Sequence, residues 1–300
     1  MNDRLRVAVL AGGRSSEHEI SLASASSVTA ALDPARYEVA TIAIGRDGRW
    51  ALPSGERPAL EAAGGDGRET LPVPRDGVPH PLGRVDVVLP ILHGPFGEDG
   101  TVQGLLELAA VQDVGSGVTA SALCMDKDLF KAVLRDRGIP VCRSVTLRPG
   151  DALEHPFDYP VFVKPARLGS SVGISKVRAE RQLADAVELA FRHDDKVLVE
   201  EFQDGVEVEC GVLGNREPVA SVVGEIVANA DWYDYAAKYD EGGMELVVPA
   251  RISDEAAARV QELAVASFVA TGCEGMARVD FFVRTDGEVV VNELNTIPGF

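Results

Sequence analysis

Two acidic residues near the end of the chain, Asp280 and Glu293, carry the strongest indication of chemistry. Each lies in a β-rich run, and Asp286-Gly287 between the runs is a preferred two-residue hairpin turn. A turn that pairs Thr285 with Glu288 would place three opposed pairs on one face of the hairpin, namely Arg278 with Asn295, Asp280 with Glu293, and Phe282 with Val291. We therefore expect the two carboxylates to lie opposite each other.

Directly opposed carboxylates repel each other, so a half-buried pair needs a compensating cation. Asp280, Glu293 and Asn295 would supply hard oxygen ligands, and neither run contains His or Cys. This donor set favours Mg²⁺ over zinc, and protein-bound Mg²⁺ usually also binds substrate phosphates. The alternative is a solvated hairpin in which Arg278 pairs with one of the acids.

A turn rich in glycine and serine, residues 169–173, separates two further β-rich runs, and Lys164 lies near the end of the first of them. Small residues let backbone N–H groups approach a phosphate closely, and a lysine supplies the opposite charge. This pattern fits a nucleoside triphosphate, although the standard phosphate-loop motif and the dinucleotide fingerprint are both absent from the sequence. The alternative is a flexible hairpin loop without a ligand.

The same turn matches G-x-S-x-G, the nucleophile elbow of esterases, with Ser171 as the candidate nucleophile. An elbow requires a helix directly after the turn, whereas residues 174–177 are β-like, and the last histidine in the sequence is His193. The context therefore argues against a hydrolase.

Two other features could serve a nucleotide site. Glu200 and Glu207 could accept hydrogen bonds from ribose hydroxyls, although solvated acids at strand ends are common. The aromatic residues between positions 232 and 239 could close over a site or fill a core. Neither feature identifies a function by itself.

The elements that must position these residues begin with a parallel α/β pattern. A β-rich run at residues 6–10 and a glycine turn precede a helical pattern over residues 20–28, and strands are predicted at residues 37–44 and 85–92. This order predicts a parallel α/β unit ending near residue 120, with an exposed loop at residues 53–81.

A second unit with helices and antiparallel strands is predicted from about residue 121. Asp126 is expected to cap a helix over residues 127–137, and further helices are predicted at residues 183–191 and 254–270. Strands before the terminal hairpin are predicted at residues 160–165, 174–177, 197–202, 206–213, 219–227 and 246–248.

Composition excludes several classes of protein. The 300 residues are 46% apolar and 25% charged, which is typical of globular proteins. Because a net charge of −18 repels phosphate backbones, we expect no nucleic-acid partner. No apolar run reaches the roughly 20 residues of a membrane span. With no signal core before Val7 and no paired spacing of its four cysteines, the chain is expected in the cytoplasm and without a membrane partner.

Taken together, the ordered motifs resemble those of the D-alanine–D-alanine ligases of the ATP-grasp superfamily, from residue 6 to residue 300. The motifs are His93-Gly-Pro-Phe-Gly-Glu98-Asp-Gly-Thr-Val-Gln-Gly104, Met125-Asp-Lys127, Lys164-Pro-x-x-x-Gly-Ser-Ser-Val-Gly173, Tyr233-Asp-Tyr-x-x-Lys-Tyr239, Arg278-Val-Asp280 and Asn292-Glu-x-Asn295-Thr-x-Pro-Gly299.

The resemblance implies an α/β fold with an N-terminal parallel α/β (preATP-grasp) domain at residues 1–120, followed by a two-part α+β ATP-grasp domain. The two parts would be residues 121–203 and 204–300. The implied reaction joins two D-alanines with ATP for peptidoglycan precursor synthesis. The first carboxylate attacks the γ-phosphate, and the second amine displaces phosphate from the acyl phosphate. ATP, two Mg²⁺ ions with Mn²⁺ as a substitute, and a cytoplasmic homodimer are implied with it.

The resemblance also assigns residues to ATP and the metal ions. Asp280, Glu293 and Asn295 would carry the metals. The residues that would bind ATP are Lys127, Lys164, Ser171 and Lys238 at the phosphates, Glu200 and Glu207 at the adenine and ribose, and Phe202 in the adenine slot. Relatives that form D-alanyl-D-lactate lack the pair Lys238-Tyr239, so its presence favours the dipeptide.

Further roles implied by the resemblance concern the amino acids. Glu17 would pair with the first D-alanine's ammonium and join Ser170 and Tyr239 in a hydrogen-bonded set; the alternative for Glu17 is an acid that stabilises a helix N-terminus. Arg278 and the N–H of Gly299 would form the oxyanion site for the tetrahedral adduct. His93 would lie near the second substrate, and the alternative is a hydrogen-bonded turn residue.

The sequence departs from the family at its end. It stops at Phe300, whereas family members continue for several dozen residues, which include a serine near the second substrate's carboxylate. We therefore expect a truncated chain. A non-catalytic ATP-binding fragment or regulator is the alternative to an active ligase.

Overall fold

The computed structural model of the chain describes residues 4–51, 85–228 and 244–300. Two compact units are present, one of Met1–Thr119 together with Ile297–Phe300 and one of Ala120–Thr296. The three-part division at residues 120 and 203 stays a prediction. The loop predicted at residues 53–81 and the aromatic residues 232–239 lie outside the described residues.

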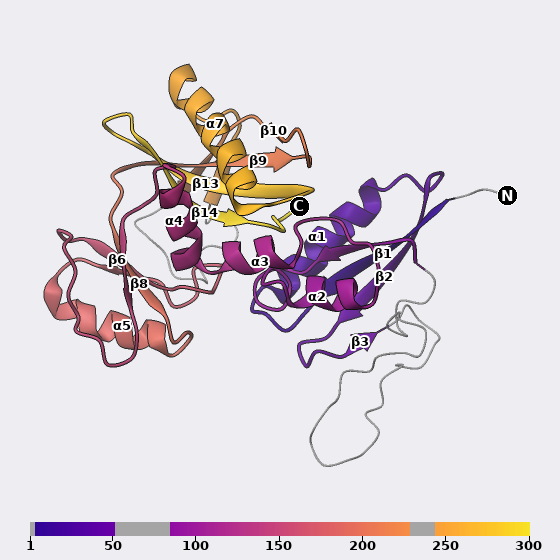
Figure 1. The fold of residues 1–300 in the computed structure, drawn as a ribbon, viewed down its shortest axis with the longest axis horizontal. Helices are drawn as coiled ribbons and strands as arrows, with labels where there is room; N and C mark the ends of the chain where they lie inside the picture. Colours follow the sequence, from indigo (N-terminus) through magenta and orange to yellow (C-terminus); the bar gives the residue numbers. More distant parts are fainter. Residues whose placement is uncertain (1–3, 52–84, 229–243) are drawn as a thin grey trace, which may run out of the picture. The chain divides into compact units, whose positions relative to one another are not determined.

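The first unit is built around a mostly parallel sheet with the order β3-β2-β1-β4 (Figure 1). Its strands are β1 (Leu5–Gly12), β2 (Tyr37–Ile44), β3 (Trp50–Ala51) and β4 (Val87–Ile91). Because β1 runs parallel to both β2 and β4, the predicted parallel α/β architecture is confirmed. The short β3, which is antiparallel to β2, has no counterpart among the predicted strands.

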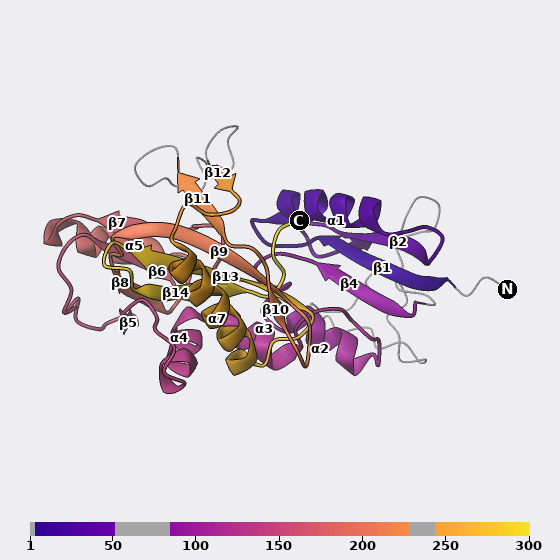
Figure 2. The same cartoon turned by 90° about the horizontal axis from the view of Figure 1, so that it is seen from above.

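Helices cover both faces of this sheet (Figure 2). On one face α1 (His18–Ala31) packs Ala25 with Val9 of β1, and on the other α2 (Thr101–Leu108) packs Leu106 with Leu10. Successive side chains of a strand point to opposite faces, so the buried part of β1, from Val7 onward, must be apolar on both faces. This explains its uninterrupted run of buried residues.

The second unit contains a smaller sheet with the order β5-β8-β6-β7, in which all pairs are antiparallel. Its strands are β5 (Ser144–Leu147), β6 (Val161–Pro165), β7 (Ser175–Val177) and β8 (Val197–Glu201). A 3₁₀ turn at Glu180–Gln182 leads into α5 (Leu183–Phe191), which covers the face that carries Val161 and Val163. By alternation, Phe162 and Lys164 point to the opposite face.

The larger sheet of the second unit has the order β12-β11-β9-β13-β14, with β10 paired to β9. Its strands are β9 (Gly205–Leu213), β10 (Val219–Ala220), β11 (Gly224–Ala228), β12 (Met244–Val247), β13 (Met276–Arg284) and β14 (Val289–Asn295). The prediction of one strand at residues 219–227 is wrong. The hydroxyl of Ser221 accepts a hydrogen bond from Gly211 N at 2.9 Å, so a side chain interrupts the ladder between β10 and β11.

One face of the larger sheet is buried under two helices, α4 (Lys127–Asp136) and α7 (Asp254–Thr271). Phe130 of α4 and Phe268 of α7 are fully buried in this core. The helix α3 (Val118–Met125) precedes α4 and, like α2, has no counterpart among the predicted helices. None of the helices within the described ranges combines the length and apolarity that crossing a membrane requires.

The terminal hairpin forms, but the predicted two-residue turn is wrong. Arg284 N donates to Glu288 O at 2.8 Å, so Thr285, Asp286 and Gly287 form a three-residue loop. Gly287 has φ = 88°, which is the left-handed conformation that such loops require.

A β-bulge in β14 then restores the register that the sequence predicts. Asp280 pairs with Glu293 and Arg278 with Asn295, as predicted, whereas Phe281 rather than Phe282 pairs with Val291. The strand β14 thus has one extra residue, Asn292, between Val291 and Glu293. The shifts at the turn and at the bulge cancel, which leaves the acidic pair in register.

The first turn of α7 offers a test of its capping. Ser253 Oγ accepts a hydrogen bond from Ala256 N at 3.2 Å. Because the alanine side chain has no acceptor, Ser253→Ala should lower the free energy of unfolding by about 1 kcal/mol, measured by urea denaturation. Ser253→Gly is the control and should cost only a few tenths of a kcal/mol. Equal losses in the two variants would show that the hydroxyl does not cap the helix.

Candidate functional site

The polar residues of β13 lie on the face of the larger sheet opposite α7. Val279 and Phe281 point into the core, so Arg278 and Asp280 point away from it. On the neighbouring strand β9, Glu209 is the register partner of Asp280. This face of the sheet therefore gathers charged side chains from adjacent strands.

The bulge at Asn292 brings β14 into the same arrangement. Val291 and Leu294 both lie in the core, so the alternation of side chains must shift by one residue between them. The shift turns Glu293 and Asn295 to the charged face. Without the extra residue, Glu293 would share the core face with Val291.

The carboxylate of Asp280 accepts three hydrogen bonds from neighbouring side chains. Arg278 Nε and Nη2 donate to its two oxygens at 2.7 and 2.8 Å, and Asn295 Nδ2 donates to Oδ2 at 3.0 Å. Arg278 Nε also lies 3.1 Å from Glu209 Oε2. Burial lowers the pKa of Arg278, but the hydrogen-bonded charge of Asp280 and the charges of Glu209 and Glu293 together raise it by more, so the guanidinium stays protonated. The arginine–acid pair that was one alternative for the hairpin is therefore present.

The donor set suits a hard divalent cation without forming a complete site. Asp280, Glu293 and Asn295 offer two carboxylates and an amide on one face, and Glu293 Oε2 lies 3.1 Å from Lys127 Nζ. Within the described ranges, no group of three His, Cys, Asp or Glu side chains is arranged to hold a metal ion. These residues fit Mg²⁺ if a further ligand, such as a phosphate, supplies the missing oxygens.

Two buried lysines share the carboxylate of Glu200. Lys164 Nζ lies 2.5 Å from Glu200 Oε2, and Lys131 Nζ is paired with Oε1 of the same group. Lys164 Nζ also donates to Asn292 Oδ1 at 3.2 Å, which joins the smaller sheet to the bulge of the larger one. Sequence reasoning missed Lys131. Its signal is the spacing from Lys127, because residues four apart lie on the same face of a helix.

The electrostatics of this lysine cluster favour an anion. Burial raises the pKa of Glu200, but Lys131 and Lys164 lower it by more, so the group is a carboxylate. Burial lowers the pKa of Lys164, but Glu200 and Glu293 raise it by more. Complete burial lowers the pKa of Lys131. Two ammonium groups beside one carboxylate leave positive charge for a phosphate.

Aromatic side chains line the same face of the smaller sheet. The rings of Phe162 and Phe202 stack with centroids 6.2 Å apart, and Lys176 Nζ lies 4.4 Å from the centroid of Phe202. Of these, only Phe202 was predicted as a site residue. Phe162 and Lys176 could have been found by pairing the two predicted strands, because they are register partners on β6 and β7. A planar base could stack in such a slot.

The turn that contains Ser170 and Ser171 is held close to α4. Lys127 Nζ donates to Leu168 O at 2.7 Å. Ser170 and Ser171 have φ = 51° and 58°, which is unusual for residues other than glycine and is typical of functional loops. The strand β7 follows the turn, whereas a nucleophile elbow needs a helix there, so the structure does not favour the esterase alternative.

Three predicted site residues belong to the first unit. His93 is buried, with Nδ1 2.9 Å from Ile297 O and Nε2 3.0 Å from Ser24 Oγ, so both nitrogens of its ring have hydrogen-bond partners. Glu17 occupies the N-cap position of α1. Gly299 follows Ile297 in the segment that His93 contacts. The substrate roles of these three residues stay predictions, and Lys238 and Tyr239 lie outside the described residues.

Comparison with protein families and with curated proteins matches most of the chain to one family. The family model of the D-ala D-ala ligase N-terminus matches residues 6–116, and that of the C-terminus matches residues 133–300. The chain is 49% identical to the D-alanine–D-alanine ligase of Mycolicibacterium smegmatis, over 99% of this chain and 88% of that protein. For the D-alanine–D-alanine ligase A of Mesorhizobium japonicum the identity is 48%, over 100% and 90% of the two chains.

Solved structures give the same result. The chain resembles the VanG D-Ala:D-Ser ligase from Enterococcus faecalis with a TM-score of 0.86 and 39% identity, over 99% of this chain and 92% of that one. It resembles the D-alanine–D-alanine ligase from Coxiella burnetii with a TM-score of 0.85 and 39% identity, over 99% and 86%. Ligases of this family use ATP and a divalent metal. The chain belongs to the D-alanine–D-alanine ligase family.

Proposed function

We propose that this chain joins two D-alanines into D-alanyl-D-alanine with ATP, for peptidoglycan precursor synthesis. The observation that carries the proposal is that two lysines reach β14, where Lys127 pairs with Glu293 and Lys164 donates to Asn292. A triphosphate and a substrate carboxylate are both anions, so their reaction needs such positive charge beside oxygen ligands for a metal. The stacked rings of Phe162 and Phe202 offer a slot for the adenine, which also supports the proposal.

The reaction proceeds in two steps, a phosphoryl transfer and then the attack of an amine on the acyl phosphate. An oxygen of the first D-alanine's carboxylate bonds to the γ-phosphorus of ATP, and the bond to the β-phosphate oxygen breaks to release ADP. The amine of the second D-alanine then attacks the acyl phosphate carbon and loses a proton, and inorganic phosphate leaves. The lysines Lys127 and Lys164 bind and orient the phosphates through both steps, and Ser171 and Lys238 are assigned to the same phosphates.

Asp280, Glu293 and Asn295 would hold two Mg²⁺ ions, or Mn²⁺ in their place. When bound, these ions neutralise phosphate charge as it develops on the leaving oxygens. Without the metal ions, Lys127 lies against Glu293, and Arg278 and Asn295 donate hydrogen bonds to Asp280. These side chains of the protein then compensate the charges of the two acids.

Roles for the amino acids follow the family. Glu17 binds the ammonium of the first D-alanine, with Ser170 and Tyr239 in the same set, and His93 lies near the second. Arg278 and the N–H of Gly299 stabilise the oxyanion of the tetrahedral adduct. Glu200 and Glu207 bind the adenine and ribose. The proposal includes a cytoplasmic homodimer, which size-exclusion chromatography with light scattering would test.

Phosphate release from ATP tests the proposal directly. We expect release that depends on D-alanine and on Mg²⁺, and a dipeptide product identified by mass spectrometry. The assay is repeated with D-serine as the second substrate, because one similar structure is a D-Ala:D-Ser ligase. ATP binding without turnover would support the non-catalytic alternative. Esterase activity abolished by Ser171→Ala would instead support a hydrolase.

A further inference from the structure

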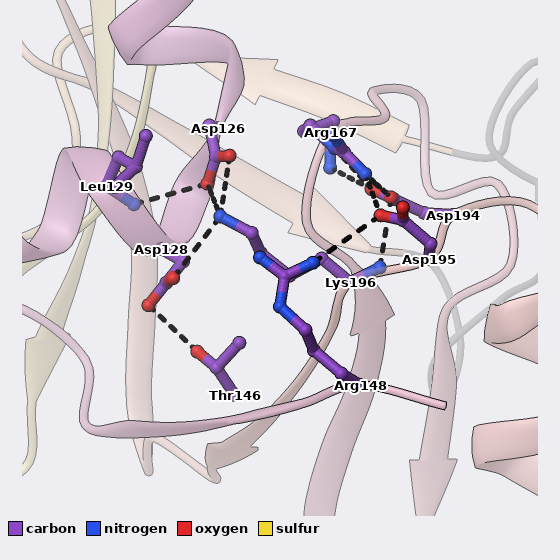
Figure 3. Close-up of polar contacts among 9 residues, drawn as sticks. All are labelled: Asp126, Asp128, Leu129, Thr146, Arg148, Arg167, Asp194, Asp195 and Lys196. Atoms are coloured by element: carbon purple, nitrogen blue, oxygen red, sulfur yellow. Dashed lines mark hydrogen bonds and ion pairs between the residues drawn. The ribbon is translucent and has the colours of Figure 1, made fainter. Parts of the chain in front are cut away.

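A second charged cluster lies in the second unit, around Lys196 just before β8 (Figure 3). Figure 3 shows its ammonium between two carboxylates of the α4 N-terminus. Lys196 Nζ donates to the oxygens of Asp126 at 2.7 and 2.9 Å and to Asp128 Oδ2 at 3.3 Å. Lys196 is 5% exposed, and Asp126 is the residue directly before Lys127. The site described above does not use Lys196.

The backbone continues this connection to Ala166, in the segment that leads into the glycine/serine turn. Lys196 O accepts a hydrogen bond from Ala166 N at 2.9 Å, and Ala166 O accepts one from Lys127 N at 3.0 Å. Three segments distant in sequence are thereby linked in one series. Lys127 is the first residue of α4, and its backbone N–H bonds to Ala166 O. It is also held through the preceding residue, Asp126, whose carboxylate bonds to Lys196.

The residues just before Lys196 lie against the chain on both sides of the glycine/serine turn. The carboxylate of Asp194 accepts hydrogen bonds from Arg167 N at 2.8 Å and from Lys196 N at 3.1 Å. At the other end, Gly173 has φ = 72°, and a Cβ there would lie 2.8 Å from His193 Cδ2. The segment 193–196 is therefore in contact with the turn before and after its two serines.

We propose that Lys196 is a positioning residue for the nucleotide phosphates, acting through Asp126 on Lys127 and through Ala166 on the glycine/serine turn. This inference rests on the proposed function, because it assumes that Lys127 and the turn bind a triphosphate. Loss of the Lys196 ammonium leaves the buried Asp126 carboxylate without its counter-charge, and Lys127 is the neighbouring cation that it would attract instead. Lys127 would then be displaced from Leu168 and from Glu293.

The test compares Lys196→Met, Lys196→Arg and the control Arg192→Met in the full chain. We expect Lys196→Met to raise the dissociation constant of Mg²⁺-ATP about 10- to 100-fold, measured by isothermal titration calorimetry. The KM for D-alanine should change less than the ATP constant. Lys196→Arg keeps the charge and should recover part of the loss. Arg192 is an exposed member of a pair with Glu188, so Arg192→Met should bind ATP as the wild type does.

Hydrogen exchange separates this inference from the proposed function. In Lys196→Met, the backbone amides of residues 166–173 should exchange faster than in the wild type and in Arg192→Met. If wild-type protein neither binds ATP nor ligates D-alanine, the proposed function fails, while the exchange rates still test the anchoring of the turn. Unchanged ATP affinity and unchanged exchange in folded Lys196→Met would overturn the inference. If that variant does not fold, Asp194→Asn, which weakens the bond to Arg167 N, must show the faster exchange instead.

Discussion

Substitution of Arg278 by lysine is expected to lower the turnover number of D-alanyl-D-alanine formation about 100- to 1000-fold, the usual cost of losing one oxyanion donor. A guanidinium has five N–H donors in a planar fork. Two of its nitrogens hold Asp280 at 2.7 and 2.8 Å, which leaves further N–H groups for a substrate oxygen. An ammonium is a point charge and cannot hold Asp280 through two parallel bonds while donating elsewhere.

The matched control for this prediction is Arg284→Lys on the same strand. Arg284 pairs with Asp286 and Glu288 near the hairpin loop, where exposed pairs contribute little. Its turnover should stay within about twofold of the wild-type value. Steady-state kinetics at saturating ATP and D-alanine give both turnover numbers. A loss in Arg278→Lys confined to the KM for ATP would show that Arg278 binds nucleotide and does not stabilise the transition state.

Sequence patterns predict the acidic pair of the hairpin, but they do not predict the loop and the bulge that bring the two acids into register. The prediction that Asp280 pairs with Glu293 comes from counting residues across the turn, and the pair is present in the structure. The three-residue loop and the bulge at Asn292 shift the register in opposite senses, so a count from an assumed two-residue turn still reaches the correct pair. A bulge leaves no clear mark in a single sequence, because Asn292 is acceptable in either strand geometry.

The buried lysines show what the sequence could not predict. Lys127 and Lys164 lie in family motifs, whereas Lys131 and Lys196 look like ordinary solvated residues, because lysine is almost never fully buried unless paired. Their partners, Glu200 and Asp126, are 69 and 70 residues away. Only the tertiary arrangement of α4 beside β8 brings them together. The helix α2 was missed for a local reason, since Gly104 in its interior weakens the helical signal.

Substitution of Glu200 by glutamine is expected to lower the free energy of unfolding by about 3 to 5 kcal/mol, the cost of breaking a buried ion pair from one side. Lys131 and Lys164 are both buried, and Glu200 is the carboxylate that they share. Its removal leaves two ammonium groups with a neutral amide between them. Urea denaturation measures the loss, and the double variant Lys131→Met/Glu200→Gln should recover part of it, because one uncompensated charge is then absent.

The neighbouring residue provides the control. Glu201 pairs with Arg143, whose side chain is 66% exposed, so Glu201→Gln should cost at most about 1 kcal/mol. Both variants change one glutamate to its neutral isostere at adjacent positions of β8. Equal losses in the two variants would show that the burial of Glu200 does not determine its contribution.

The pH dependence of stability identifies the charge itself as the cause. The pKa of Glu200 is lowered in the folded protein from the ordinary value of 4.5, because Lys131 and Lys164 outweigh the effect of burial. The unfolded chain therefore binds this proton more readily than the folded one. The stabilisation is complete above pH 4.5 and is lost as the pH falls through the folded-state pKa. The difference in stability between wild type and Glu200→Gln should shrink over that acidic range. A difference that stays constant from pH 7 to about pH 3 would mean that glutamine destabilises through packing, and that the carboxylate charge does not hold the two lysines in place.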